Sequence, residues 1–472
     1  TLEEYEGDPD VLARQGGGDW NTKPKGFADR FEDLSAEEQG MRRRTFLKLS
    51  GFAAVFAAAA GCEKPAEQIL PYVTAPEEIT PGVPNFYAST CGGCSAACGA
   101  IVKTREARPI KLEGNPRSTV SNGALCSRGQ ASLLELYDPD RLREPFDVSG
   151  NKTVSWDVVD KNAADALSSG TGDVVLLTGT IHGPARTKLI DDMKKAFPRL
   201  RHVAYDTLAE DERLDAREEV FGERVLPRYH FEKSECTVLL GADPISDGFS
   251  PVEMNAGLGK ARRVHKDKSK EAHYYMGRLI AFEPIITTSG QNADWRFRVK
   301  ASHLPNIAMA IAQQLSQDGH SEVGSLNLAV NVANVESEAG LESGTIKKVA
   351  DNLWEKRGKS LVYAGGTMGR TPAAKELHIA ACLINAMLGN EGQTIDSSRP
   401  SNQLKGSLRD MMQLVEDMKA GKVRTLLVYG TNPEYSLPGA VEFRDAMAQV
   451  DNRFSFSTHL DETAKLCQYV LP

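Results

Sequence analysis

Cys91-Gly92-Gly93-Cys94-Ser95-Ala96-Ala97-Cys98 is the stretch on which the fold depends, and a fourth cysteine, Cys126, follows it after 27 residues. Soft thiolates at this density select zinc or an iron–sulfur cluster. Paired C-x2-C knuckles are more typical of structural zinc than the C-x2-C-x3-C run found here. We therefore expect Cys91, Cys94, Cys98 and Cys126 to hold a [4Fe-4S] cluster, and a zinc-stapled interaction scaffold is the alternative.

The residues around the cysteines indicate a small β-rich domain over 86–145. The stretch Ile101–Gly114 alternates apolar and polar residues around a turn, which predicts a β-hairpin between the third and fourth cysteines.

A leader precedes the cysteines, at residues 41–62. Met41-Arg42-Arg43-Arg44-Thr45-Phe46-Leu47 is followed by a short apolar stretch, and this pattern is typical of a twin-arginine (Tat) signal. The apolar stretch is too short to cross a bilayer as a helix. We expect Tat export to the periplasmic side of a bacterial inner membrane. Cys62 follows Ala59-Ala60-Gly61 and is a candidate lipidation site, with simple cleavage as the alternative.

Composition sets the remaining bounds. The 472 residues include 56 Lys+Arg and 64 Asp+Glu, so the net charge of −8 argues against a nucleic-acid partner. Residues 1–40 are acidic and rich in Gly and Asp, which predicts a disordered extension. The proline-containing residues 63–85 predict an extended linker. The scattered Cys236, Cys382 and Cys467 are expected to be buried small apolar residues.

From about Thr153 onward, short apolar runs alternate with helical segments, which predicts parallel sheet covered on both faces. Runs at 173–180, 236–241, 279–282, 360–364 and 425–429 are the expected strands, and 304–315 and 373–388 are expected helices. Ligands bind at the carboxyl ends of such strands, where backbone N–H groups can hold phosphates. The candidate residues there are Gly365, Gly366, Gly430 and Asn432.

Taken in order, these motifs resemble the large subunit of the molybdopterin (bis-pterin guanine dinucleotide) oxidoreductase family. The resemblance runs from about residue 86 to the end and also includes the stretches Gly123–Gln130, Asp138–Leu142, Ile285–Thr288, Ala293–Asp294, Leu388–Gly392 and Tyr429–Pro433. It implies an α/β fold in which the small iron–sulfur domain precedes two doubly wound α/β domains. Residues 146–182 and 358–472 would form one of them, interrupted by the other at 183–357. It also implies that Arg128 lies between cluster and pterin.

One departure from this family concerns the metal. Active members present Cys, selenocysteine, Ser or Asp to molybdenum from a loop that corresponds here to His202–Thr207, where Asp206 is the only residue of a suitable type. Beyond it, Leu208–Arg224 is rich in Asp, Glu and Arg, and we expect a solvated segment that fills the cofactor funnel. We therefore expect the molybdopterin guanine dinucleotide to be absent.

The stretches Ile69–Gly82 and Thr1–Tyr5 resemble the iron–sulfur/molybdopterin-like subunit family of alternative complex III. Many members of that family have lost the cluster cysteines, whereas this chain keeps all four. The resemblance implies an electron-transfer and scaffold subunit of a membrane-associated quinol-oxidising respiratory complex. Its partners would be a membrane quinol-oxidising subunit, a haem c subunit and a ferredoxin-like cluster region beyond this chain, so we expect the natural protein to be longer. The alternative is an active molybdenum oxidoreductase similar to polysulfide or thiosulfate reductases.

Overall fold

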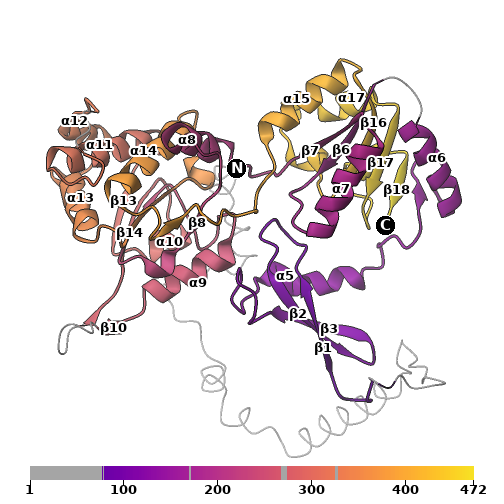
Figure 1. Ribbon diagram of the computed structural model, residues 1–472, viewed down its shortest axis with the longest axis horizontal. Coiled ribbons are helices and arrows are strands. Elements are labelled where there is room, and N and C mark those ends of the chain that lie inside the picture. The colour runs from indigo at the N-terminus through magenta and orange to yellow at the C-terminus, as the bar shows by residue number, and fades with distance from the viewer. Residues whose placement is uncertain (1–76, 78, 169–171, 267–273, 325–327) are drawn as a thin grey trace, which may run out of the picture. The chain divides into compact units, whose positions relative to one another are not determined.

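The computed structural model describes residue 77 and residues 79–168, 172–266, 274–324 and 328–472 (Figure 1). The expected acidic extension, the Tat signal, Cys62 and most of the expected linker lie outside the described residues. Within the described part of the chain, no helix is long and apolar enough to cross a membrane.

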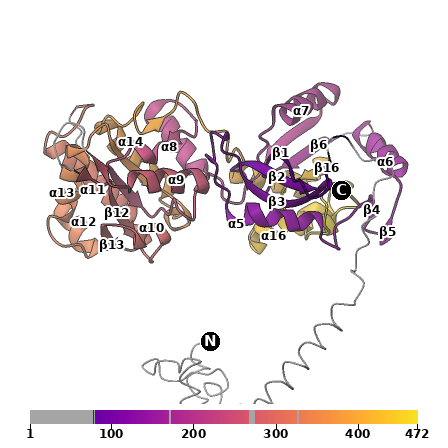
Figure 2. The ribbon, with the colours of Figure 1, turned by 90° about the horizontal axis from the view of Figure 1, so that it is seen from below.

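The cysteine-containing part, which we call the cysteine domain, is built on an antiparallel sheet of β1 (Asn85–Thr90), β2 (Gly99–Arg105) and β3 (Arg108–Gly114) in that order. The predicted hairpin is therefore confirmed. Its tight turn consists of Glu106 and Ala107, which both have positive φ angles, of 45° and 63°, as two-residue hairpin turns often require. The short helices α5 (Ser127–Ala131) and η1 (Ser132–Leu136) pack against β3 (Figure 2).

The first α/β domain contains a seven-stranded sheet in the order β5-β4-β18-β17-β16-β6-β7. Its parallel strands are β6 (Asp173–Thr178), β7 (Leu200–Ala204), β16 (Val423–Tyr429), β17 (Asn452–Phe456) and β18 (Tyr469–Leu471). At one edge, β4 (Phe146–Asp147) pairs antiparallel with β18, and β5 (Lys152–Thr153) pairs antiparallel with β4. One face packs against α15 (Leu408–Lys419) and α17 (Phe443–Ala448). The other face packs against α6 (Trp156–Ser168) and α7 (Pro184–Ala196).

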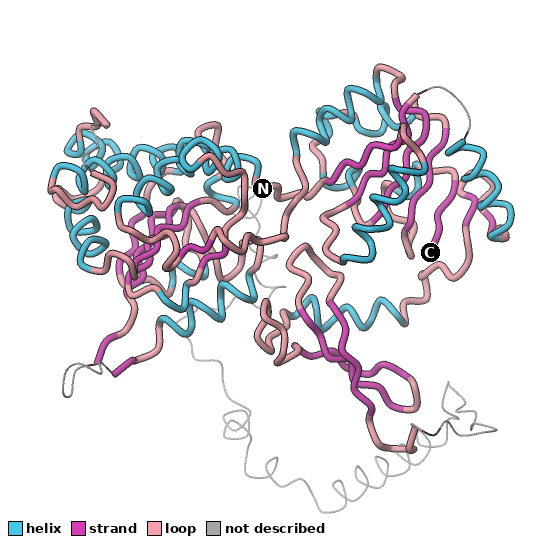
Figure 3. The backbone as a smooth tube through the Cα atoms, viewed as in Figure 1, coloured by secondary structure: helices cyan, strands magenta, loops and turns pink. Residues whose placement is uncertain are grey.

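The second α/β domain contains a parallel sheet in the order β13-β12-β9-β14. These strands are β9 (Cys236–Leu240), β12 (Arg278–Glu283), β13 (Trp295–Arg298) and β14 (Ser360–Ala364). One face packs against α11 (Leu304–Gln317), α12 (Val332–Ala339), α13 (Thr345–Glu355) and α14 (Ala374–Met387), and α9 (Pro251–Ala261) covers the other. In Figure 3 the strands of this sheet lie between these helices.

The pattern of apolar residues explains why α11 forms a buried helix and β14 a buried strand. In α11, Ile307, Ile311 and Leu315 recur every four residues and are fully buried against the sheet. All five residues of β14 are buried, as expected for a strand covered on both faces. The runs predicted as strands and the two predicted helices are all confirmed.

Strand pairing shows that both boundaries of the inserted domain differ from the predicted ones. β7 pairs with β6 and therefore belongs to the first α/β domain, although it lies beyond residue 182. β14 pairs with β9 and therefore belongs to the inserted domain, although it lies beyond residue 357. The chain crosses into the insertion after β7 and returns before α15, so the insertion spans about residues 206–407.

The remaining elements are short or lie at the edges. They are α8 (Asp211–Phe221), β8 (Arg228–Tyr229), η2 (Phe231–Lys233), β10 (His265–Lys266), β11 (Tyr274–Tyr275), α10 (Thr288–Gln291), η3 (Ala301–His303), η4 (Thr367–Gly369), β15 (Ile395–Asp396), α16 (Pro433–Ser436), η5 (Gly439–Val441) and η6 (Ala464–Leu466). Of these, α8 packs against α14 and matters most for the site.

Candidate functional site

The structure brings the four predicted cluster cysteines to one cavity of about 440 Å³. Burial, and after it the charges of Cys94, Cys91 and Cys126, raise the pKa of the Cys98 thiol to about 11, so all four groups lie within electrostatic reach. A bound metal would remove this penalty, because metal coordination stabilises the thiolate.

Local backbone geometry shapes this cavity. Cys126 precedes α5 as its N-cap, and its sulfur accepts a hydrogen bond from Gly129 N at 3.4 Å. A Cβ atom at Gly114 would lie 2.5 Å from the backbone of Ala124, so only glycine lets the end of β3 approach the Cys126 segment this closely. The cysteine spacing thus comes with a backbone that holds the sulfurs in place.

Arg128 lies in α5 and lines the same cavity as the cysteines, and its side chain is exposed. The opposite wall comes from the inserted domain: Ile245, Ser246 and the first residues of α9. Arg128 therefore lies beside the predicted cluster, and its place between cluster and pterin stays a prediction.

The predicted phosphate loop after β14 is occupied by the chain's own groups. Gly365 and Gly366 have positive φ angles of 111° and 69°, and the next residue, Thr367, donates its backbone N–H and its hydroxyl to the Asp247 carboxylate, both at 2.5 Å. A carboxylate therefore already holds the donors that a phosphate would need, and its charge repels one.

Arg213 of α8 reaches the same strand end from the other side. Its guanidinium donates to Ala364 O at 2.8 Å, to Glu210 at 2.7 Å and to Tyr229 OH at 3.2 Å. A Cβ atom at Gly365 would lie 2.8 Å from Arg213. Burial disfavours the charge of Arg213, but Glu210, Tyr363 and Tyr229 together outweigh this effect and raise the pKa of Arg213 well above its ordinary value.

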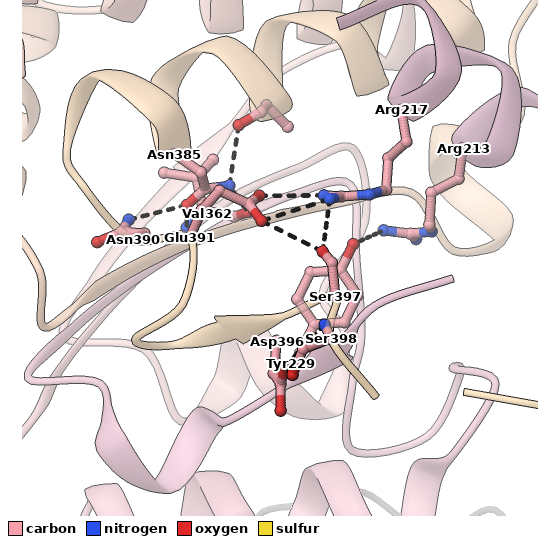
Figure 4. Close-up of polar contacts among 11 residues, drawn as sticks. Arg213, Arg217, Tyr229, Val362, Asn385, Asn390, Glu391, Asp396, Ser397 and Ser398 are labelled. Atoms are coloured by element: carbon pink, nitrogen blue, oxygen red, sulfur yellow. Dashed lines mark hydrogen bonds and ion pairs between the residues drawn. The ribbon is translucent and has the colours of Figure 1, made fainter. Parts of the chain in front are cut away.

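A second buried arginine extends this network (Figure 4). Arg217 donates to both carboxylate oxygens of Glu391, at 3.0 and 3.3 Å, and to Ser397 Oγ at 2.7 Å. Asn385 bonds both backbone groups of Val362 in β14 and receives a hydrogen bond from Asn390 at 2.9 Å. The stretch Leu388–Gly392 therefore has a structural role in fixing β14 against α14.

The expectation of a solvated segment at Leu208–Arg224 is wrong for one face of the helix. Arg213 and Arg217 are 3% and 2% exposed, and Glu210 and Asp211 are also buried. The opposite face stays in solvent, since Glu212, Glu218 and Glu219 are exposed.

Asp206 is held by hydrogen bonds where the chain crosses between the two α/β domains. Its carboxylate accepts from the Thr180 N–H at 3.2 Å, from the Thr180 hydroxyl and from Gly406 N at 2.8 Å. A Cβ atom at Gly406 would lie 2.2 Å from Asp206 N, so glycine is required there. These contacts tie the two crossing segments together, and three donors already use the carboxylate.

The second predicted loop lies at the end of β16, on the other sheet from Gly365 and Gly366. Asn432 accepts from Thr463 N at 3.1 Å and from the Thr463 hydroxyl at 2.7 Å, and donates to Glu462 at 2.7 Å. Gly430 differs, since no atom lies within 4 Å of a Cβ atom built on it. The structure thus places the four predicted pterin residues on two domains, with open space at only one of the two loops.

Cys236, Cys382 and Cys467 are buried, as predicted. Burial raises the pKa of each thiol, to about 12, 11 and 12 respectively, so they are unreactive.

Residues 84–138 match the family model described as the molybdopterin oxidoreductase Fe4S4 domain. The cysteine domain is thus similar to the Fe4S4 domain of the molybdopterin oxidoreductases. The Fe4S4 domain supports the predicted [4Fe-4S] cluster on the four cysteines. A solved structure, acetylene hydratase from Pelobacter acetylenicus, matches the fold with a TM-score of 0.62 and 12% identity, covering 82% of this chain and 62% of that one.

Curated relatives match stretches of the chain that are longer than the Fe4S4 domain. One is the menaquinone reductase, molybdopterin-binding-like subunit, of Nitratidesulfovibrio vulgaris, which is 23% identical over 82% of this chain and 58% of the relative. Another is the molybdopterin-containing subunit of arsenate respiratory reductase of a Shewanella species, which is 26% identical over 50% of this chain and 28% of the relative. The chain thus spans less than two thirds of the length of these relatives.

Sequence reasoning missed three residues that the structure places at these sites: Asp247, Arg213 and Gln403. Gln403 donates to Ala96 O, within the cysteine loop, at 2.8 Å. Arg213 and Arg217 are four positions apart, which puts both side chains on one helix face. This spacing is a local signal that could have identified the two arginines.

Proposed function

We propose that this protein is a cluster-bearing electron-transfer and scaffold subunit of a membrane-associated, quinol-oxidising respiratory complex, similar to alternative complex III, and that it works without molybdenum. The Fe4S4 domain and the relative named for menaquinone reductase support a redox role linked to quinones.

The observation that carries the proposal is the occupied loop after β14. Asp247 takes the Thr367 donors, and Arg213 lies against Gly365 with its charge already paired to Glu210. The residues present in the inserted domain therefore do not fit a pterin dinucleotide at this strand end. Asp206 gives further support, because a carboxylate with three hydrogen-bond donors is poorly placed to ligate a metal.

In this proposal the chain performs no bond chemistry. A [4Fe-4S] cluster supplies one-electron transfer when bound, and its potential depends on burial and on hydrogen bonds to the ligand sulfurs. Cys91, Cys94, Cys98 and Cys126 would hold it, while Gly129 N donates to the Cys126 sulfur. Arg128 adds a positive charge at the cavity wall, which favours the more negative reduced state.

The proposed partners are a membrane quinol-oxidising subunit, a haem c subunit and a ferredoxin-like cluster region. The proposed location is the periplasmic side of the inner membrane, reached by Tat export and retained through partners or a lipid on Cys62. These proposals rest on the leader and on the resemblance to the alternative complex III subunit family.

The second candidate is an active molybdenum oxidoreductase. The open space at Gly430 favours it, as do the names of relatives such as arsenate respiratory reductase.

Elemental analysis separates the two candidates. The full-length natural complex is purified anaerobically, and iron, zinc, molybdenum and tungsten are measured on one sample. The proposal expects at least four irons per chain and neither molybdenum nor tungsten. Molybdenum or tungsten near one per chain would overturn it in favour of the second candidate.

A further inference from the structure

Gln403 joins the cysteine domain to the inserted domain. Its Nε2 donates to Ala96 O at 2.8 Å and to Ser250 Oγ at 3.3 Å, and its Oε1 accepts from Ser401 Oγ at 3.0 Å. The side chain is 7% exposed. The orientation of the amide follows from these partners, because the flipped amide would set two acceptor oxygens against each other at Ala96.

The segment that Gln403 holds is the part of the cysteine loop that most needs support. Ala96 is 2% exposed and lies between Cys94 and Cys98. The next residue, Ala97, has a φ of +49°, which is costly for a residue other than glycine. Within the loop, Ala97 N donates to Cys94 O at a long 3.3 Å. An outside hydrogen bond to Ala96 therefore stabilises a backbone conformation that is unfavourable by itself.

A second connection runs from the same place. Ser250, which precedes α9, donates to Glu253 at 3.0 Å, and Glu253 accepts from Arg228 at 2.6 Å. Arg228 also donates to Thr119 O at 3.4 Å, in the segment that leads to Cys126. The hydrogen bonds through Gln403 and Arg228 thus anchor the cysteine domain at two points.

This anchoring connects two parts of the chain that line the cavity. The cavity of about 440 Å³ has the four cysteines on one side and the first residues of α9 on the other, and Ser250 lies directly before α9. Loss of the Gln403 bond would loosen the Cys94–Cys98 segment against α9 and admit more water.

We infer that Gln403 is a positioning residue for the cluster: it holds the cysteine loop against the start of α9 and thereby limits the water that reaches the cluster. The inference rests on the [4Fe-4S] cluster of the proposed function and does not depend on the absence of molybdenum or on the membrane partners.

The test is Gln403→Ala in the full-length protein, with two readouts that a purely structural residue would not move. The midpoint potential, followed by EPR-monitored titration, should rise, because added water stabilises the more negative reduced cluster. Bleaching of the visible absorbance in air should be several-fold faster. Ser250→Ala, which removes one of the two Nε2 contacts, should shift both readouts in the same direction but less, and it serves if Gln403→Ala fails to fold.

Gln313→Ala is the matched control. Gln313 is 6% exposed, lies in α11 of the same inserted domain and accepts from Leu328 N at 2.9 Å. It should lower the melting temperature without changing the potential or the bleaching rate. If Gln403→Ala and Ser250→Ala behave like Gln313→Ala, the inference is overturned. Wild-type protein without iron would instead overturn the proposed function.

Discussion

The cysteine loop and the glycine loop after β14 both look like ligand sites in the sequence, yet their surroundings differ. The cysteine sulfurs face a shared cavity together with Arg128. At the glycine loop, Asp247 already holds Thr367, and Arg213 lies against Gly365. A glycine loop with the sequence of a phosphate site can thus be filled by the chain's own side chains, whereas the four cysteines share one cavity and remain a candidate ligand site.

The largest effect is expected at the cysteine loop. Cys94→Ser should abolish most of the visible absorbance and lower the iron content by about four per chain, because the cluster loses a thiolate ligand. Ultraviolet–visible spectra and iron analysis measure this. Cys236→Ser, at a buried thiol in β9, is the control and should keep the spectrum. An unchanged spectrum in Cys94→Ser would show that the cysteine loop is no cluster site.

At the glycine loop, the largest expected effect is on stability. Arg213→Ala leaves Glu210 buried without its partner, so we expect a loss of about 3–5 kcal/mol in the free energy of unfolding. Urea unfolding followed by far-UV circular dichroism measures it, and the cluster absorbance should stay. The control is Arg409→Ala, whose side chain is 65% exposed and pairs with Asp215, with an expected change within about 0.5 kcal/mol. Equal effects in the two variants would argue that Arg213 is not essential to the filled loop.

Asp247→Ala addresses the other occupant of that loop. Removing the carboxylate leaves the Thr367 donors to water, and since this site is partly exposed, we expect a cost of about 1 kcal/mol. Asp160→Ala, at an exposed position of α6, is the control and should be close to neutral. If Asp247→Ala instead raised the free energy of unfolding, the carboxylate would be destabilising at this place, and the loop would be a candidate ligand site that the carboxylate blocks.

A further effect of comparable size depends on pH and comes from His378, whose ring lies beside Gly365. Burial, and then Arg213 and Arg370, hold its pKa well below the ordinary value. Below about pH 6.5 the unfolded chain binds a proton that the folded protein does not, so stability falls by about 1.4 kcal/mol per pH unit. Above that pH the histidine is neutral in both states and has no effect on the pH dependence.

Urea unfolding at pH 7.5 and 5.5 measures this dependence. His378→Gln should reduce the loss of stability between the two pH values by roughly 1.4 kcal/mol, while the control His265→Gln should not. A loss in His378→Gln as large as in the wild type would refute the assignment to His378.

The sequence predicted most of the fold, and the four cysteines that it singled out line one cavity. A short apolar run such as 360–364 indicates a parallel strand, because both faces of such a strand are covered. The cysteines are recognisable as a ligand set from their short spacing. The filled glycine loop was not predictable, because its occupants come from residues 213 and 247, more than 100 positions before Gly365. Charged residues such as those of α8 are expected to be solvent-exposed from sequence alone. Only the fold shows that some of them have buried partners.

The interleaved order of the strands also has a consequence for how the chain is made. β6 and β7 are synthesised before the insertion, but β16, which pairs with β6, comes after it. At roughly 5–20 residues per second, the insertion of about 200 residues takes about 10–40 s to translate. During that time one edge of β6 has no strand to pair with, while all four strands of the inserted sheet become available in order. The order of translation thus favours early folding of the inserted domain. The first α/β domain can complete its sheet only after its last strands have been synthesised.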